Sequence, residues 1–196
     1  MYNKLNISEN TLFTLSLFSG GFNKEYHVRE IQRILGIGLG TVQFSLRALE
    51  KRTVLRSKKI GRSRVYFINK TEISRFYFVM AEAYKTTAFL AGKGLLREVI
   101  EAINPYIGEI GLIFGSYAKG LEKEGSDLDV FAVGEYAKDE INKIGKQYNL
   151  DISVKSYPPK VFYEYMRKDV LITEVLDNHL AFKGIDRFVN AVFDYG

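Results

Sequence analysis

One stretch of the sequence, residues 111–134 (GLIFGSYAKGLEKEGSDLDVFAVG), places two strand-like apolar runs on either side of a polar loop. The first run ends in Gly115 and Ser116, and a strand that ends in this way can present backbone N–H groups to an anion. The second run carries Asp127 and Asp129 two residues apart, so both carboxylates leave the same face of a strand. Two such carboxylates repel each other unless a cation lies between them. One half suits phosphate and the other suits magnesium, so nucleotide chemistry is the first hypothesis.

Composition narrows the class of protein. A chain of 196 residues with 46% hydrophobic content can form one domain or two small ones and is not disordered. The absence of cysteine excludes disulfides, zinc–cysteine sites and thiol catalysis. The two histidines, His27 and His179, are too few for a histidine metal cluster, and His179 is expected on the surface at the start of a strand. With no signal-peptide pattern at the start and no apolar run that could span a bilayer, a soluble cytoplasmic protein without a membrane partner is expected.

The charge is distributed unevenly along the chain. Residues 1–70 hold 13 Lys and Arg against 4 Asp and Glu, whereas the remainder holds 15 basic against 19 acidic residues. This asymmetry predicts two modules, of which the first suits a polyanion.

The first module is predicted to contain three helices and a hairpin. Residues 8–18 start at Ser8, a good N-cap, and show helical spacing of apolar residues. Residues 27–36 place Val28, Ile31, Ile34 and Leu35 on one face and stop at a glycine. Residues 38–55 point Val42, Leu46 and Leu49 inward. Two short alternating runs, residues 54–60 and 64–69, then read as a hairpin.

This order of elements resembles a winged helix-turn-helix of the bacterial and archaeal regulator type. In such folds the helix after the turn enters the major groove of DNA and the hairpin wing lies along the backbone. The resemblance implies that the reading helix offers Thr41, Gln43, Phe44 and Arg47. The wing residues that suit phosphate contacts are Lys58, Lys59, Arg62 and Arg64. Double-stranded DNA is the expected partner, and the alternative is a solvated basic face on a module that binds protein.

A connecting helix is predicted over residues 71–92, between domains at residues 1–70 and 93–196. Asn69 and Glu72 have the spacing of a capping box. An aromatic-rich stripe follows, made of Ile73, Phe76, Tyr77, Met80 and Tyr84. The stripe either packs between the two modules or forms a homodimer interface, which binding to a palindromic operator would favour.

The second module is predicted to alternate helices and strands. An amphipathic helix contains Leu95, Leu96, Val99, Ile100 and Ile103. It is followed by the two runs of residues 111–134, a helix over residues 136–148 and a third strand over residues 150–157. If the third strand pairs beside the second, Asp151 can join Asp127 and Asp129 in a cluster of three carboxylates. A helix, a brief strand over residues 179–184 and a last helix complete the module.

The pattern FGSYAKG…SDLDVFAV resembles the signature of the polymerase-beta-type nucleotidyltransferase superfamily in its minimal form, over about residues 95–194. Gly115, Ser116, Asp127 and Asp129 match that signature, and Lys119 with Gly120 fits its small-then-basic turn. The resemblance implies an α+β chain: a winged helix-turn-helix (three helices plus a β-hairpin wing), then a small α/β nucleotidyltransferase domain with a mixed sheet.

The resemblance also implies a mechanism of two-metal nucleotidyl transfer. Asp127, Asp129 and Asp151 would be both catalytic residues and ligands of two Mg²⁺ ions, with a nucleoside triphosphate as substrate. Asp151 would also accept the proton of the acceptor hydroxyl. The outer phosphates would be bound at the first turn and its loop, by Gly115, Ser116, Lys119 and Ser126.

Minimal members of the superfamily often act as antitoxins that transfer AMP to a hydroxyl of a HEPN-type toxin, and a fused winged helix would repress the protein's own operon. Two alternatives stay open. The chain could be a transcription regulator whose second domain only senses a nucleotide, or it could modify a small molecule or an RNA end.

Overall fold

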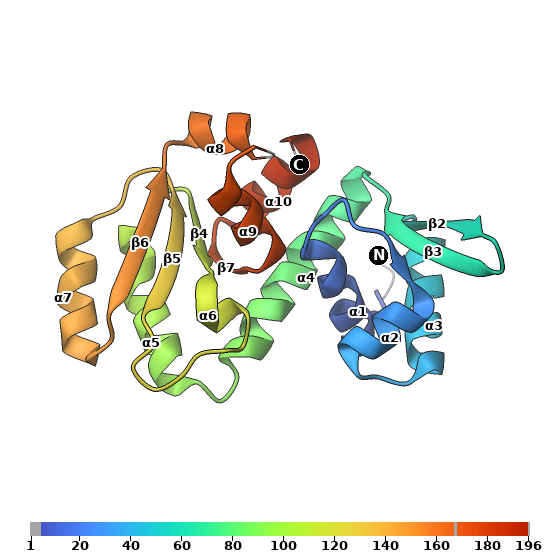
Figure 1. Cartoon of the computed structure of the whole chain (residues 1–196), viewed down its shortest axis with the longest axis horizontal. Helices are drawn as coiled ribbons and strands as arrows, with labels where there is room; N and C mark the ends of the chain where they lie inside the picture. Colours follow the sequence, from blue (N-terminus) through green and yellow to red (C-terminus); the bar gives the residue numbers. More distant parts are fainter. Residues whose placement is uncertain (1–4, 167, 196) are drawn as a thin grey trace. The chain divides into compact units, whose positions relative to one another are not determined.

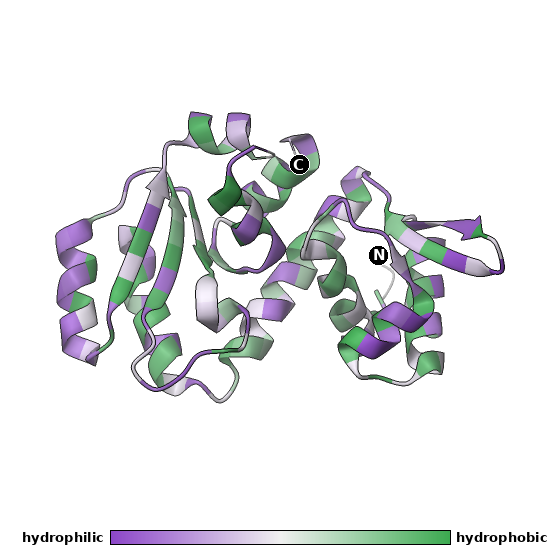
Figure 2. Ribbon diagram, in the orientation of Figure 1, coloured by the Kyte–Doolittle hydropathy of each residue, from purple (hydrophilic) through white to green (hydrophobic). Residues whose placement is uncertain are grey.

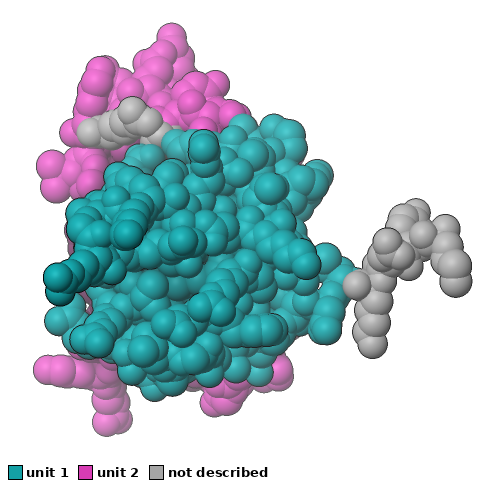
Figure 3. Space-filling model, turned by 90° about the vertical axis from the view of Figure 1, so that its right-hand side faces the viewer, with its two compact units in different colours: residues 1–84 teal, residues 85–196 magenta. Residues whose placement is uncertain are grey.

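A computed structural model describes residues 5–166 and 168–195 of the chain (Figure 1). The chain divides into two compact units, residues 1–84 and residues 85–196, which are coloured separately in Figure 3. The division falls inside helix α4 (Glu72–Leu90), the helix that the sequence predicts as a connection. This helix therefore contributes residues to each unit.

The first unit has the elements that the sequence predicts, with one addition. Ser8 caps the first helix, because its hydroxyl accepts from the Thr11 N–H at 3.3 Å. Gly36 ends the second helix in the left-handed conformation, at φ 66°. The addition is a two-residue strand, too short for a sequence pattern, which pairs with the hairpin in the order β1-β3-β2. The elements before α4 are α1 (Glu9–Ser19), β1 (Tyr26–His27), α2 (Val28–Leu35), α3 (Leu39–Lys51), β2 (Leu55–Ile60) and β3 (Ser63–Ile68).

The core of the first unit confirms the predicted inward face of α3. Val42, Leu46 and Leu49 are fully buried. The prediction for α2 is wrong in part, because Ile31 is buried but Ile34 is 49% exposed. A helix of eight residues buries a narrow stripe, and Ile34 lies at its edge, near the end of α2.

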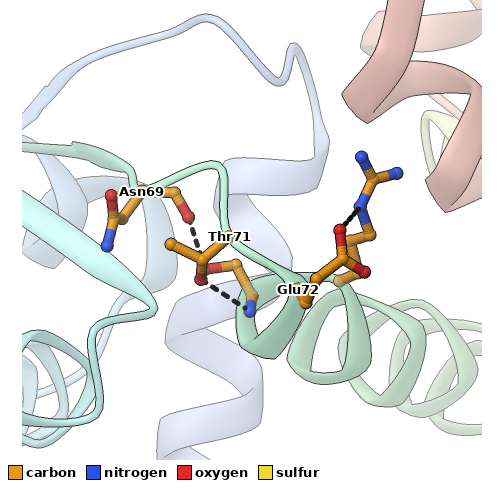
Figure 4. Close-up of polar contacts among 5 residues, drawn as sticks. Asn69, Thr71 and Glu72 are labelled. Atoms are coloured by element: carbon orange, nitrogen blue, oxygen red, sulfur yellow. Dashed lines mark hydrogen bonds and ion pairs between the residues drawn. The ribbon is translucent and has the colours of Figure 1, made fainter.

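The predicted capping box of Asn69 and Glu72 is not formed at the start of α4 (Figure 4). The Thr71 hydroxyl accepts from the Ser74 N–H at 3.2 Å, so Thr71 is the cap. The Asn69 side chain instead donates to the Thr53 carbonyl at 2.7 Å, and Glu72 contacts Arg75 at 3.2 Å. The cap lies two residues later than predicted because Asn69 is still held beside the end of the hairpin.

Thr71→Ala is expected to lower the free energy of unfolding by about 1 kcal/mol, the usual cost of removing an N-cap oxygen. Glu72→Gln is the matched control, since it removes the ion pair from the exposed Glu72 to Arg75 and should cost a few tenths of a kcal/mol at most. Urea unfolding of the full chain measures both. A larger loss for Glu72→Gln than for Thr71→Ala would contradict the assignment of the cap.

The second unit is built on a mixed sheet with the order β6-β5-β4-β7. Strand β4 pairs antiparallel with β5 and β7. Strand β5 pairs parallel with β6, so the third strand does lie beside the second. The elements are α5 (Gly94–Ile103), the 3₁₀ turn η1 (Asn104–Tyr106), β4 (Ile110–Ile113), α6 (Gly115–Ala118), β5 (Leu128–Val133), α7 (Lys138–Tyr148), β6 (Ile152–Tyr157), α8 (Pro159–Tyr165), α9 (Val170–Asp177), β7 (Leu180–Lys183) and α10 (Ile185–Tyr195).

The two faces of β5 have different neighbours. Leu128, Val130 and Ala132 lie in a core cluster with apolar residues of α5 and α7. On the other face, Phe131 contacts Phe162 of α8, with ring centroids 5.8 Å apart. Helix α7 shows a largely hydrophilic outer surface beside these apolar strands (Figure 2). Because side chains alternate along a strand, Asp129 leaves the sheet on the Phe131 face.

His179 is buried, which corrects the expectation of a surface residue. Its Nδ1 lies 3.0 Å from the Val175 carbonyl and 3.1 Å from that of Leu176, and both partners accept, so Nδ1 donates. Its ring meets Phe188 edge-on at 4.6 Å. The carbonyls are those at the end of α9, so His179 satisfies a helix terminus that would otherwise be buried without partners.

Candidate functional site

The end of β4 lies directly beside Asp129, the acidic residue of β5. The Phe114 N–H donates to the Asp129 carbonyl at 3.0 Å, which fixes the two strands side by side at this point. Gly115 follows with φ 68°, and a Cβ atom there would overlap the Asp129 carboxylate. The position therefore needs glycine for its backbone conformation and for space. The predicted Gly115–Ser116 turn and the predicted acid Asp129 are brought together.

The acidic pair differs in exposure. Asp127 is exposed just before β5, whereas Asp129 is half-buried within it. Burial raises the pKa of the Asp129 carboxyl above its usual value, and the negative charges of Asp127 and Glu174 add to this, while Lys155 opposes it. The protein thus holds a carboxylate where its charge is unfavourable in the absence of a cation.

Asp151 lies directly before β6. The parallel register sets Asp129 opposite Ser153, which puts Asp127 opposite Asp151 just outside the paired residues. The Leu128 N–H donates to the Asp151 carbonyl at 2.8 Å. Within residues 5–166 and 168–195, however, no three His, Cys, Asp or Glu side chains are grouped to hold a metal ion. The predicted cluster of three carboxylates is not formed, because Asp127 and Asp151 precede their strands and their exposed side chains are not fixed by the sheet.

Asp127 and Asp151 do face a common hollow of about 450 Å³. Polar side chains of α7 and of the segment that follows it line this hollow, among them Asn142, Lys146 and Asn149. The hollow offers hydrogen-bond donors and acceptors beside the exposed end of the acidic pair. It can therefore admit a polar molecule next to Asp127.

The remaining predicted nucleotide-binding residues are placed around the same turn. Ser116 is half-buried in α6. The Ser126 hydroxyl accepts from the Lys123 N–H at 2.9 Å, so it closes the loop that leads to the acidic pair. Lys119 follows α6, and its ammonium group donates to Glu174 of α9 at 2.7 Å.

The predicted DNA-binding residues of α3 lie on its outer side. Gln43, Phe44 and Arg47 are exposed and Thr41 is half-buried. Phe44 is 68% exposed, so it does not pack under the hairpin and stays available on the outer side of α3. Gln43 also lines a groove of about 300 Å³ together with Arg29 and Arg64.

The four basic residues predicted to contact DNA from the hairpin do not share one face. Lys59 pairs directly with Arg64, so these two side chains lie on one face, and Lys58 lies on the other. Lys58 contacts Glu25 at 2.7 Å, and Arg64 contacts Glu50 at 3.4 Å. In the described part of the chain, Lys59 and Arg62 have no carboxylate partner.

Sequence reasoning missed Glu174 and Lys155 as neighbours of Asp129. Lys155 carried a signal, because the predicted third strand has Lys155 on the same face as Asp151. Glu174 carried none, since helix α9 reaches the site only through the packing of the C-terminal elements.

No helix in the described residues is long and apolar enough to cross a membrane.

One region of the chain matches a known protein family. No curated protein matches the chain. Among solved structures, the chain is similar to that of TrmBL2, an archaeal chromatin protein that shows a novel mode of DNA binding. The identity is 13%, the match covers 87% of this chain and 69% of that chain, and the TM-score is 0.28. The part of the chain that contains Gly115, Ser116 and the acidic pair, residues 95–182, matches the model of the nucleotidyltransferase domain family.

Proposed function

We propose that this protein is a DNA-binding nucleotidyltransferase, which transfers a nucleoside monophosphate from a nucleoside triphosphate to an acceptor hydroxyl. The observation that carries the proposal is the contact of the Gly115 turn with the Asp129 carboxylate, inside the region that matches the nucleotidyltransferase domain. A phosphate-binding turn and a cation-binding carboxylate are useful side by side when the ligand is a metal-bound phosphate.

The residues present fit magnesium. Mg²⁺ is usually held by one or two carboxylates, with substrate phosphates and water completing its shell. Asp127 and Asp129 supply such a pair. Burial and the nearby negative charges raise the pKa of the Asp129 carboxyl, so a bound cation would stabilise its charged form. When bound, the metal would neutralise charge on the triphosphate and lower the pKa of an acceptor hydroxyl.

The protein's own groups would then orient the reactants. The Ser116 hydroxyl and the backbone N–H groups after Gly115 would hold the outer phosphates, leaving the α-phosphorus open to attack from the opposite side. Asp151 lies across from Asp127 on the hollow of about 450 Å³, and would orient the acceptor hydroxyl and accept its proton.

A labelling experiment tests the proposal and identifies the nucleotide and the acceptor. The protein is incubated with magnesium, a cell extract and ATP, GTP, CTP or UTP labelled on the α-phosphate. Label should enter one class of macromolecule or small molecule. Within the proposal, the acceptor is the hydroxyl of a HEPN-type toxin and the nucleotide is ATP. Binding of nucleotide with no labelled acceptor would favour the alternative, a regulator that senses nucleotide.

We propose that the first unit is a winged helix-turn-helix, in which α3 reads the major groove and the hairpin of β2 and β3 is the wing. Its support is the set of exposed residues on α3 and the excess of basic residues over residues 1–70. The exposed Ile73 and Phe76 of α4 are the apolar residues through which a homodimer on a palindromic operator would form.

Lys59→Ala with Arg62→Ala is expected to weaken binding to all duplex sequences alike. The slope of log affinity against log salt should flatten by up to about 0.9 for each lost phosphate contact. Lys58→Ala with Arg64→Ala should flatten the slope less, because Glu25 and Glu50 already neutralise these two residues in the free protein. Titration of full-length protein with duplex DNA at several salt concentrations measures both slopes.

The charge-matched control is Lys138→Ala with Lys160→Ala, two exposed residues of the second unit. An equal effect of this control would show that net charge alone governs binding, and would contradict a role for the wing.

A further inference from the structure

Lys119 and Glu174 form an ion pair at the rim of the candidate nucleotide site. The Lys119 ammonium donates to the Glu174 carboxylate at 2.7 Å. Lys119 follows α6 and is three residues past Ser116, whereas Glu174 comes from α9, more than fifty residues further along the chain. The two side chains are 36% and 47% exposed, so either can leave the pair without breaking the core. The pair therefore joins the turn to α9, a helix in which the sequence predicted no site residue.

Glu174 also acts on the acidic pair. The Glu174 carboxylate lies near enough to Asp129 to repel it electrostatically, as the carboxylate of Asp127 does. Lys155 is the cation that opposes them. Lys119, which could neutralise an incoming phosphate, is bound to one of these carboxylates. An anion that approaches the Gly115–Ser116 turn thus meets negative charge and a lysine that is already paired.

We propose that Glu174 competes with the triphosphate for Lys119, so that Lys119 exchanges its carboxylate partner for a phosphate when nucleotide binds. Glu174 is then a specificity-determining residue: it repels phosphates that carry no cation and favours nucleotide that arrives with magnesium. The inference rests on the proposed nucleotidyltransferase function and extends it to a residue on α9.

The size of the effect follows from the exposure of the pair. A partly exposed ion pair is weakened by solvent, and breaking it changes an equilibrium by a factor of about two to five. Glu174→Gln keeps the size of the side chain and removes the charge, so it releases Lys119 and removes one repulsive carboxylate. Glu174→Asp keeps the charge and should behave more like the wild type.

Calorimetry of the full chain tests the proposal. The ligands are ATP and inorganic tripolyphosphate, and each is titrated once with magnesium and once with a chelator. Glu174→Gln should tighten binding about two- to fivefold, with the larger gain in the chelator. Lys119→Gln should loosen binding, and adding Glu174→Gln to it should give a smaller gain than in the wild type. Glu140→Gln is the matched control, since it breaks an exposed pair with Lys143 on α7 and should leave affinity unchanged.

Equal or weaker binding by Glu174→Gln, or a gain that persists undiminished without Lys119, would overturn the exchange. A loss of thermal stability in Glu174→Gln with unchanged affinity would assign the pair a structural role and would overturn it as well. If the wild type binds neither probe, the proposed function fails and the inference fails with it. If the wild type binds both and Glu174→Gln changes nothing, the inference alone fails.

Discussion

Replacement of Asp127 and Asp129 together by asparagine is expected to abolish magnesium-dependent binding of nucleoside triphosphate and to leave a protein at least as stable as the wild type. Binding should be lost because the amide oxygens cannot replace two carboxylate ligands of a hard cation. Stability should not fall because the fold keeps Asp129 half-buried, near the like charges of Asp127 and Glu174.

The gain in stability should depend on pH in a defined direction. The folded pKa of Asp129 is raised above its unfolded value, so ionisation of this group disfavours the folded state. The penalty is absent below the unfolded pKa, grows as pH rises through the folded pKa and persists at neutral pH. The double variant should therefore be more stable than the wild type at neutral pH, and this advantage should disappear in acid.

Calorimetry with magnesium and nucleotide, together with thermal unfolding at several pH values, measures both effects. Asp139→Asn with Asp186→Asn removes two exposed acids from the first turns of α7 and α10 and is the charge-matched control. The control should keep nucleotide affinity and lose a little stability, since acids favour helix N-termini. Equal magnesium–nucleotide affinity in wild type and the Asp127/Asp129 variant would exclude the acidic pair as the metal site.

Asp151→Asn is expected to reduce nucleotidyl transfer by a factor of about 10²–10⁴, the usual effect of removing a general base, with little change in nucleotide affinity. The separation of the two effects follows from the position of Asp151. It lies on the polar hollow beside Asp127 and is not grouped with the acidic pair as a third ligand.

Two quantities measure this separation, the turnover number and the nucleotide dissociation constant. Both are compared among Asp151→Asn, Asn149→Asp and the wild type. Asn149→Asp adds a carboxylate to the same hollow and controls for a change of charge at its rim. A parallel loss of affinity and turnover in Asp151→Asn would return Asp151 to the metal site. Unchanged transfer would remove it from the reaction.

Local patterns in the sequence are sufficient to predict the strands and the turn around the candidate site. Gly115, Asp127 and Asp129 carry their own signals, because a positive φ and a two-residue spacing on a strand are local properties. The strand nature of β6 could also be predicted, since the run after α7 alternates polar and apolar residues. Its parallel pairing with β5 was only one possibility until the fold was known.

Long-range packing accounts for what the sequence did not show. Glu174 of α9 reaches Lys119 although the two residues are far apart in the chain, and no spacing in the sequence encodes that contact. His179 was expected on the surface because the end of α9, whose carbonyls it satisfies, has no strong sequence signal. The three-carboxylate cluster failed for a related reason: strand register brings Asp151 opposite Asp127, but register does not fix side chains that lie beyond the end of a strand.

The most direct test of nucleotidyl transfer uses ATP labelled either on the α-phosphate or on the γ-phosphate, with the acceptor found in the extract. We expect the α-label to become bound to the acceptor and the γ-label to be released with pyrophosphate. Asp127→Asn with Asp129→Asn should abolish the transfer. Transfer of the γ-label, or transfer of the α-label that survives the double substitution, would contradict the proposed function.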